Sequence, residues 1–321
     1  MERSEFNEWR NCMNNRLDCT LIIPSHNRHE YLERIFEYYK DANFDVVCCD
    51  SSEKKYDKKI PENIKYSHLP SLNFKQKMFK TISEANTEYI VCCADDDFVL
   101  KNSIQKGIEF LNLNSDYNSI VGKYVGFFKP FNSLFYSTYS STNFYIPTAN
   151  NPTLNVQEFM SNYYMILWGL YRKESILKAY EIILNSDFRN DNFIEFIIGS
   201  FLSYSGNIKH LDLIWGVREI EFINSWGRKH KSLCIEESNI LQNDINSIEK
   251  NFDLSTEEKV FCKAIDSYMK FCKRQTKNFK TIILDILPIN FKSVLYKALK
   301  KPLYENNADL LEINNLLTKF H

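Results

Sequence analysis

The sequence predicts an α/β protein built on a mainly parallel β-sheet that carries helices on both faces. Two features of the chain indicate this class. Short apolar runs of strand length alternate with longer segments of helical periodicity through the first half of the 321 residues. The apolar runs are continuous instead of alternating between apolar and polar residues, as is typical of strands that are buried on both faces.

The first half of the chain divides into strands and helices in regular order. The opening strand, residues 19–24, is a β-rich apolar run that stops at a proline. The next helix, residues 28–40, places apolar and aromatic side chains at a spacing of three and four residues. The later elements have the same two signatures, with strands expected at residues 44–50, 64–69 and 89–94 and helices at 72–86 and 102–113.

The second half carries weaker patterns. Residues 119–151 are aromatic and rich in Ser, Thr and Asn, and we expect them to form strand and loop that line an acceptor cleft. From about residue 236 the pattern is helical and charged, so we expect a large domain over residues 1–235 and a helical region over 236–321. Between these parts the sequence predicts helices at 156–164, 173–185 and 192–204 and strands at 166–171 and 208–217.

The composition argues against several classes of protein. The formal net charge is −1, so no strong positive field is available to hold nucleic acid. The eight glycines form neither a G-x-G-x-x-G nor a Walker A loop, which weakens dinucleotide-binding and P-loop interpretations. The nine cysteines show no C-x-x-C spacing, and no apolar run reaches the ~18 residues of a spanning helix. We therefore expect a cytoplasmic protein with reduced, buried thiols.

Polar side chains follow three of the expected strands at the point where each strand ends. They follow Pro24, occur at Asp50, and form the run Asp95-Asp96-Asp97. In open α/β sheets, ligands bind at the carboxyl ends of the strands. The sequence therefore predicts a ligand site where these three clusters meet.

The three consecutive aspartates indicate a cation. Acids crowded at a strand end repel one another and lose hydration, so a neutralising partner is expected. Mg²⁺ or Mn²⁺ held by one or two carboxylates would take its remaining ligands from water and phosphate. The alternative is a solvated acidic turn that caps the next helix.

Four segments in this order resemble motifs of family 2 glycosyltransferases. Residues 22–28 (IIPSHNR) resemble the opening strand, residues 50–52 (DSS) the second-strand acid, and residues 94–97 (ADDD) the D-x-D segment. Residues 217–227 resemble a subgroup of bacterial family 2-like enzymes. The resemblance spans about residues 17–230. It implies the Rossmann-like GT-A fold and a bacterial transferase that moves a sugar from a nucleotide-sugar onto a surface glycan, as in polysaccharide biosynthesis.

The resemblance also implies where the nucleotide would bind. Asp50 would accept a hydrogen bond from the uracil N–H, and because an acid suits this imide edge, a UDP-sugar is expected as the donor. His26 departs from the usual family pattern and is either a phosphate or base contact or a surface residue. The nucleotide pocket itself would be lined by Pro24, Ser25, Asn27 and Arg28.

Two further groups of donor contacts follow from the resemblance. Lys75 or Gln76, at the start of the helix after the third strand, would touch base or phosphate, and a solvated helix face is the alternative for Lys75. Asp95 would lie near the ribose of the donor, and Asp96 would also contact the bound donor. Asp97 would hold the metal, with Asp95 as the second metal ligand.

An inverting transfer needs a carboxylate that takes the proton of the acceptor hydroxyl. Asp187, Asp191 and Glu195 recur at four-residue spacing and would share one face of a helix. Asp191 aligns best with the catalytic acid of the family and is the predicted base, with Glu195 as the second candidate. The alternative is that Asp191 and Asn192 only cap the helix.

Two further segments are candidates for binding a membrane surface and the donor diphosphate. Residues 291–301 form a basic amphipathic stretch that could rest on the inner face of the cytoplasmic membrane, near a lipid-linked glycan acceptor. A solvated helix face is the more common role of such a stretch. One segment could fold over the diphosphate of the donor, and it carries Arg218, Trp226, Arg228 and His230. Within this segment, Trp226 would either stack on a sugar or only pack against the protein.

Other functions fit parts of the sequence. A haloacid dehalogenase-like phosphatase would use Asp95 and Asp97, but its motif normally lies on the first strand of its fold, and three strands are expected before it here. A nucleotidyltransferase needs a glycine-rich loop that residues 25–28 lack. A non-catalytic glycan-binding protein on the same fold would be expected to lack the acids that this chain retains.

Overall fold

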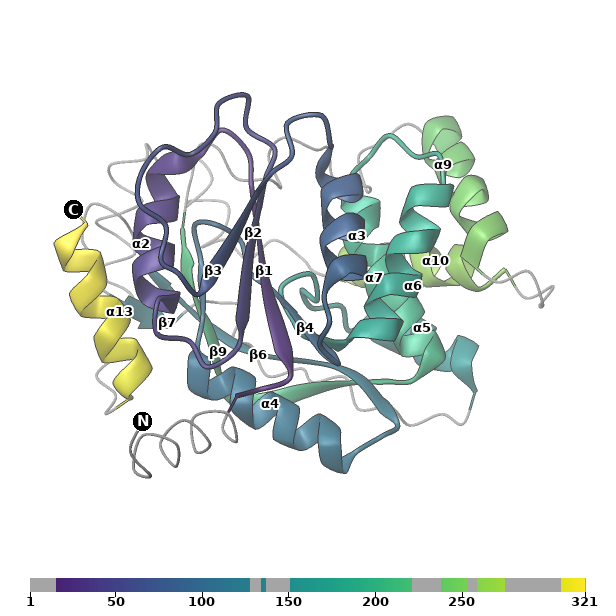
Figure 1. Ribbon diagram of the computed structural model, residues 1–321. Coiled ribbons are helices and arrows are strands. Elements are labelled where there is room, and N and C mark those ends of the chain that lie inside the picture. Colours follow the sequence, from purple (N-terminus) through teal and green to yellow (C-terminus); the bar gives the residue numbers. More distant parts are fainter. Residues whose placement is uncertain are drawn as a thin grey trace, which may run out of the picture.

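The computed structural model describes residues 16–127, 134–136, 151–220, 238–252, 259–274 and 307–320. A nine-stranded sheet runs through the described part of the molecule (Figure 1) in the order β3-β2-β1-β4-β8-β6-β9-β5, and β7 pairs with β6. The strands are β1 (Cys19–Ser25), β2 (Asp45–Asp50), β3 (Ile64–His68), β4 (Tyr89–Cys92), β5 (Phe98–Val99), β6 (Tyr117–Phe127), β7 (Leu134–Tyr136), β8 (Leu170–Arg172) and β9 (Asn207–Glu219).

Four strands form a parallel half of this sheet, as predicted. β1 lies between β2 and β4 and is parallel to both, and β3 is parallel to β2. Every residue of β1 and β4 is buried. Leu21 and Ile23 belong to one hydrophobic core, whereas Ile22 belongs to the core on the opposite face. The apolar runs are continuous because both faces of these strands are covered.

The other half of the sheet is mixed. β8 is antiparallel to both β4 and β6, while β6 and β9 are parallel. β5 is a two-residue strand that the sequence did not predict. It follows Asp97 directly and pairs antiparallel with Gly216 and Val217 of β9. This pairing holds the aspartate run against the end of β9.

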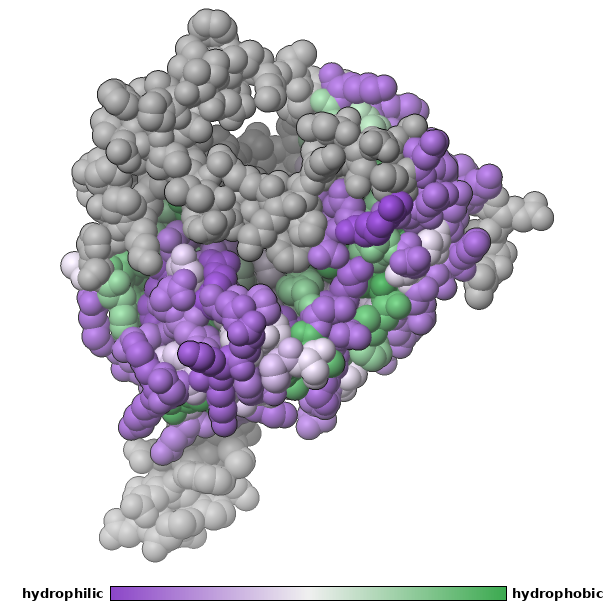
Figure 2. Space-filling model, turned by 90° about the horizontal axis from the view of Figure 1, so that it is seen from above, coloured by the Kyte–Doolittle hydropathy of each residue, from purple (hydrophilic) through white to green (hydrophobic). Residues whose placement is uncertain are grey.

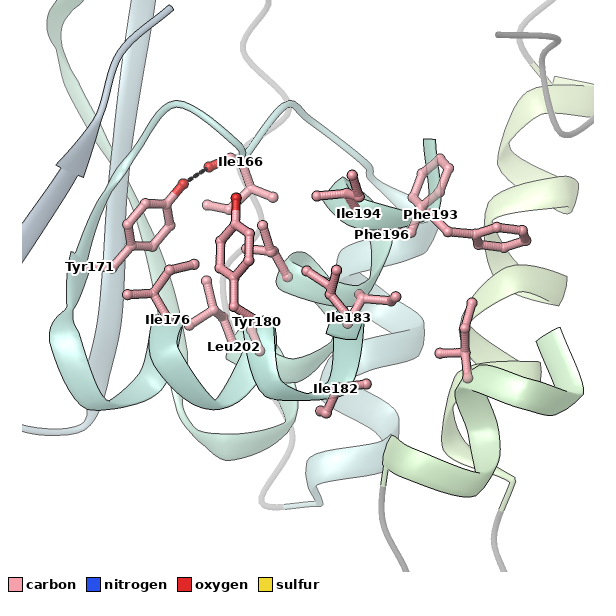
Figure 3. Close-up of a cluster of buried hydrophobic side chains, with 14 of the residues drawn as sticks. Ile166, Tyr171, Ile176, Tyr180, Ile182, Ile183, Phe193, Ile194, Phe196 and Leu202 are labelled. Atoms are coloured by element: carbon pink, nitrogen blue, oxygen red, sulfur yellow. Dashed lines mark hydrogen bonds between the residues drawn. The ribbon is translucent and has the colours of Figure 1, made fainter. Parts of the chain in front are cut away.

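Helices cover both faces of the sheet (Figure 1). On one face α2 and α4 pack with the core that contains Leu21, and on the other face α3, α5, α6 and α7 pack with the core that contains Ile22. Figure 3 shows part of the second core, in which Tyr171, Tyr180 and Ile194 come from β8, α6 and α7. The helices are α2 (His29–Tyr39), α3 (Phe74–Glu84), α4 (Lys101–Leu113), α5 (Pro152–Ser161), α6 (Lys173–Asn185) and α7 (Asn192–Ser205).

Among the residues that the structure describes, three helices follow residue 236, where a helical region was predicted. α9 (Ser238–Phe252) and α10 (Val260–Arg274) contribute to the core beside α5 to α7, and α13 (Ala308–Lys319) contributes to the core beside α2. Asp309 of α13 accepts a hydrogen bond from the backbone N–H of Asn102 at 3.1 Å, at the start of α4. The predicted division at residue 235 lies outside the described residues and stays a prediction. No helix in the described ranges is both long and apolar enough to span a bilayer.

The carboxyl ends of β1 and β2 lie at the top of Figure 1, where the chain leaves them for its next segments. Figure 2 looks down on this end, and the described residues there are mainly hydrophilic, with smaller hydrophobic areas between them. The polar residues that the sequence places after β1, β2 and β4 therefore meet at one edge of the sheet.

Candidate active site

The ends of β1, β2 and β4 bring the predicted polar residues together. Ser25 lies opposite Asp50 in the parallel register of β1 and β2. The Ser25 hydroxyl donates a hydrogen bond to Oδ2 of Asp95 at 2.8 Å. All three side chains are buried, with Ser25 2%, Asp50 0% and Asp95 3% exposed. One short hydrogen bond thus joins the end of β1 to the aspartate run after β4.

The three consecutive aspartates point to different partners. Asp95 lies 3.4 Å from Nη1 of Arg28, and Asp96 forms an ion pair with Nη2 of the same guanidinium. Asp97 accepts hydrogen bonds from Nε of Arg218 at 3.1 Å and from the backbone N–H of Glu219 at 3.0 Å. The run therefore connects the loop after β1 with the end of β9.

Burial changes the acidity of two of these carboxyls. It raises the pKa of Asp95 to about 7 against the opposing effect of Arg28, and Asp96 adds to the increase. It likewise raises the pKa of Asp97 to about 7 against the effect of Arg218. Burial therefore favours the protonated forms of both carboxyls, and a cation that binds beside them would favour their ionised forms.

Arginine side chains partly offset the negative charge of the aspartate run. Besides Arg28 and Arg218, Nη2 of the buried Arg34 donates to the backbone carbonyl of Asp96 at 2.7 Å and to Oε2 of Glu219 at 2.5 Å. Within the described ranges, no group of three or more His, Cys, Asp or Glu side chains is arranged to hold a metal. The carboxylates of Asp95 and Asp97 suit a Mg²⁺ or Mn²⁺ ion that takes most of its ligands from phosphate and water.

Asp50 accepts hydrogen bonds from every side of its carboxylate. Oδ1 accepts from the backbone N–H of Ser52 at 2.8 Å and from the Ser52 hydroxyl at 2.5 Å. Oδ2 accepts from the hydroxyl of Tyr66 at 2.5 Å and from Nε2 of His29 at 2.8 Å. Burial acts to raise the pKa of Asp50, but these hydrogen bonds outweigh it and hold the pKa below its usual value.

The loop after β1 closes over the end of β2. Asn27 has a φ of 55°, in the left-handed region that asparagine tolerates better than most residues. Its backbone N–H donates to Oγ of Ser52 at 2.7 Å. His26 is exposed, and its Nδ1 lies 3.0 Å from the carbonyl oxygen of Ser51. These bonds position Arg28 beside the aspartates, whereas Pro24 is buried in β1.

Lys77 is a site residue that the sequence analysis missed. Its ammonium donates hydrogen bonds to the carbonyl of Ser25 and to Oγ of Ser51, so Lys77 connects the ends of β1 and β2. The side chain is buried, and burial lowers its pKa. The sequence does contain a sign of this role. Lys77 lies on the apolar face of α3 with Phe74 and Met78, where a lysine is unusual.

Residues 20–169, which include β1, Asp50 and the aspartate run, match the family model described as Glycosyl transferase family 2. The chain carries a family 2 glycosyltransferase domain. The prediction of a family 2-like glycosyltransferase is thereby confirmed. Because the match includes Asp95 and Asp97, those residues belong to this domain and not to a haloacid dehalogenase-like phosphatase.

Solved structures agree with the predicted GT-A fold of this glycosyltransferase. Residues 1–349 of S. aureus TarS superpose with a TM-score of 0.52 at 14% identity, covering 88% of this chain and 78% of that one. The same TarS fragment in complex with UDP-GlcNAc superposes with a TM-score of 0.55 at 15% identity, covering 85% and 76%. At this identity the likeness shows the fold. A search of curated protein sequences finds no match.

The two residues predicted at the start of α3 differ in their surroundings. Nζ of Lys75 lies 3.6 Å from Oδ1 of Asp191 and 3.5 Å from the centre of the Phe188 ring. Gln76 instead forms a capping box with Asn73, in which each side chain binds the backbone N–H of the other residue. Lys75 therefore contacts Asp191 at the start of α7, and Gln76 stabilises the start of α3.

The predicted acids at residues 187–195 do not share one helical face, and that prediction is wrong. α6 ends at Asn185 and α7 begins at Asn192, so Asp187 lies in the connection between them. Asp191 occupies the N-cap position of α7, but its side chain makes no capping hydrogen bond. The proposed alternative role as a side-chain cap is therefore not observed.

Glu195 supports the backbone before β8. Its Oε1 accepts hydrogen bonds from the backbone N–H groups of Ile166 at 2.8 Å and Leu167 at 3.2 Å. Burial raises the pKa of Glu195, and these two hydrogen bonds act against the increase. The contacts give Glu195 a structural role. Outside the described residues lie Trp226, Arg228, His230 and the stretch 291–301.

Proposed function

We propose that this domain transfers a sugar from a UDP-sugar donor to a hydroxyl of a surface glycan, and that the transfer inverts the anomeric centre. The observation that supports it is the joining of Ser25, Arg28 and Asp95 beside the enclosed Asp50, at the edge of the sheet where α/β proteins bind ligands. A UDP-sugar fits this edge, and the similar TarS fold has been solved with UDP-GlcNAc.

The donor diphosphate would bind beside the aspartate run. Arg28 contacts Asp95 and Asp96, and Arg218 contacts Asp97, so two guanidinium groups of the kind that binds phosphate oxygens lie beside the run. Mn²⁺ or Mg²⁺ would be held by Asp97 with Asp95, together with phosphate and water. The metal would offset the negative charge of the departing nucleoside diphosphate.

Asp191 is the proposed base. Asp191 lies beside α3, whose Lys75 contacts it and whose Lys77 contacts the carbonyl of Ser25 at the end of β1. The Asp191 side chain is 29% exposed, which leaves it accessible to an acceptor hydroxyl. Glu195 is the weaker candidate because its carboxylate already binds two backbone N–H groups.

The acceptor is proposed to be a glycan or a lipid-linked glycan at the cytoplasmic face of the inner membrane. A bacterial enzyme that uses a UDP-sugar from the cytoplasm would meet such an acceptor there. Binding to vesicles with and without anionic lipid would test the proposed peripheral membrane contact. Failure to bind either kind of vesicle would contradict it.

A nucleotide panel tests the proposed function. Thermal unfolding is measured with UDP, GDP, CDP and their sugars, each with Mn²⁺ and with EDTA. A ligand that binds only the folded state raises the unfolding temperature, and at a given concentration a tighter ligand raises it more. UDP and UDP-sugars should give the largest increase, and only with Mn²⁺. A larger increase with GDP or CDP would contradict the proposed donor.

A further inference from the structure

Asp50 has no remaining capacity for a nucleobase. A carboxylate offers about four lone-pair sites, and Ser52, Tyr66 and His29 together supply four donors to them. The side chain of Asp50 is 0% exposed. A base that approached from solvent would therefore meet the neighbours of Asp50 before it met the carboxylate.

Two of these neighbours are also occupied. The hydroxyl of Tyr66 donates to Asp50 and accepts from the backbone N–H of Tyr56 at 3.0 Å. The hydroxyl of Ser52 donates to Asp50 and accepts from the backbone N–H of Asn27 at 2.7 Å. Ser52 is also buried, with 1% of its surface exposed. Neither hydroxyl is suited to bind a base directly.

His29 is the remaining neighbour. Its Nε2 bonds to Asp50, its ring packs edge-on against Tyr56 with ring centres 5.5 Å apart, and its side chain is 28% exposed. Nδ1 has no hydrogen-bond partner among the residues that the structure describes. We propose that Nδ1 of His29, and not Asp50 itself, accepts the hydrogen bond from the uracil N–H of the donor.

Asp50 would then act as a positioning residue that sets the tautomer of His29. An ionised carboxylate can only accept, so Nε2 must carry the proton, and Nδ1 of the neutral ring is left as an acceptor. An acceptor matches N3–H of uracil and opposes the N3 lone pair of cytosine. This inference rests on the proposed UDP-sugar donor and adds the residue that reads its base.

Calorimetric titration tests whether His29 accepts the hydrogen bond from uracil. UDP and CDP are titrated into the wild type, His29→Phe and Glu30→Gln at about pH 8, where imidazole is ordinarily neutral. The wild type should prefer UDP by about 10-fold or more. His29→Phe keeps the ring against Tyr56 but removes both nitrogens, and should bind the two nucleotides about equally. Glu30→Gln, at the exposed neighbouring position, is the matched control and should keep the wild-type preference.

Asp50→Asn gives an independent readout. The amide oxygen should stay with the N–H of Ser52, which turns the amide NH₂ toward Nε2 of His29. Nε2 then has to accept, Nδ1 carries the proton, and the UDP-to-CDP ratio should fall below that of His29→Phe. An aspartate that holds a histidine tautomer in a catalytic triad behaves in a comparable way.

The outcomes separate the two proposals. If His29→Phe keeps the preference for UDP while Asp50→Asn loses it, Asp50 reads the base directly and the inference is overturned. The same holds if both variants keep the preference. If the wild type binds neither UDP nor CDP, or prefers CDP, the proposed donor itself is wrong and this inference fails with it.

Discussion

Nζ of Lys75 lies 3.6 Å from Oδ1 of Asp191, so an ion pair joins the first turn of α3 to the start of α7. This contact brings the proposed base to the helix whose Lys77 also binds the end of β1. Both partners are partly exposed, and the energy of such a pair is small. An acceptor hydroxyl can therefore displace Lys75 from Asp191 at little cost.

Asp191→Asn should lower kcat by about 10²–10⁴-fold, because a positioned base contributes about that much to the rate. KM for the UDP-sugar should change little, since the donor binds at the strand ends. Steady-state kinetics with saturating acceptor measures both. Asp187→Asn is the matched control: Asp187 lies in the α6–α7 connection, where its backbone N–H bonds to Ser247, and the variant should retain activity. Near-normal turnover of Asp191→Asn would place the base elsewhere.

Glu195 should matter for stability rather than for proton transfer. Glu195→Ala leaves the N–H groups of Ile166 and Leu167 without their acceptor, and each such loss costs about 1–3 kcal/mol. Glu195→Gln retains an oxygen acceptor and should keep both stability and turnover. Urea unfolding measures the first effect and kinetics the second. A stable but inactive Glu195→Gln would transfer the role of base to this residue.

Asp97→Asn should abolish turnover and leave a folded protein. Burial raises the pKa of Asp97 to about 7 in the folded state, above its unfolded value, so ionisation disfavours folding. The free energy of unfolding should therefore decrease as the pH rises from about 4 to about 7. Asp97→Asn should weaken this dependence and be no less stable than the wild type at about pH 8. Urea unfolding across this range measures it, and a variant that unfolds would show that the run is structural.

Arg34 and Glu219 form an ion pair in which both side chains are nearly inaccessible, 6% and 5% exposed. Arg34→Met should lower the free energy of unfolding by about 3–5 kcal/mol, because it removes the guanidinium that pairs with the buried Glu219. The double variant Arg34→Met/Glu219→Gln should lose less than Arg34→Met alone. Urea unfolding of the three proteins gives the comparison. Equal losses in the single and double variants would contradict a coupled pair.

The sequence predicted the strands that carry the site because each of them is marked by its own run of apolar residues. Residues 19–24, 44–50 and 89–94 are continuous apolar runs, and they form β1, β2 and β4. β5 was not predicted, because a strand of two residues that follows three aspartates is too short to show a periodic pattern. The antiparallel direction of β8 is set by its pairing with β4 and β6, which no local pattern records.

The sequence predicted many of the residues of the site but not the contacts between them. Asp50, Arg28 and the aspartate run were found from motifs, but the enclosure of Asp50 depends on His29 and Tyr66, which come from different elements of the fold. The contacts of Lys77 with Ser25 and Ser51 depend on the packing of α3 against the ends of β1 and β2, which no local pattern records. The role of arginines in neutralising the aspartates likewise depends on Arg218, 121 positions away from Asp97.

Calorimetric titration of UDP into the wild type, in Mn²⁺ and in EDTA, decides whether a metal-assisted UDP-sugar site is present at these strand ends. Asp95 and Asp97 should bind the metal in their ionised forms, so UDP should bind at least about 10-fold more tightly with Mn²⁺. The same titration with Asp97→Asn should show little difference between the two buffers. Equal affinity of the wild type in Mn²⁺ and EDTA would contradict the metal role, and tighter binding of GDP or CDP would contradict the proposed donor.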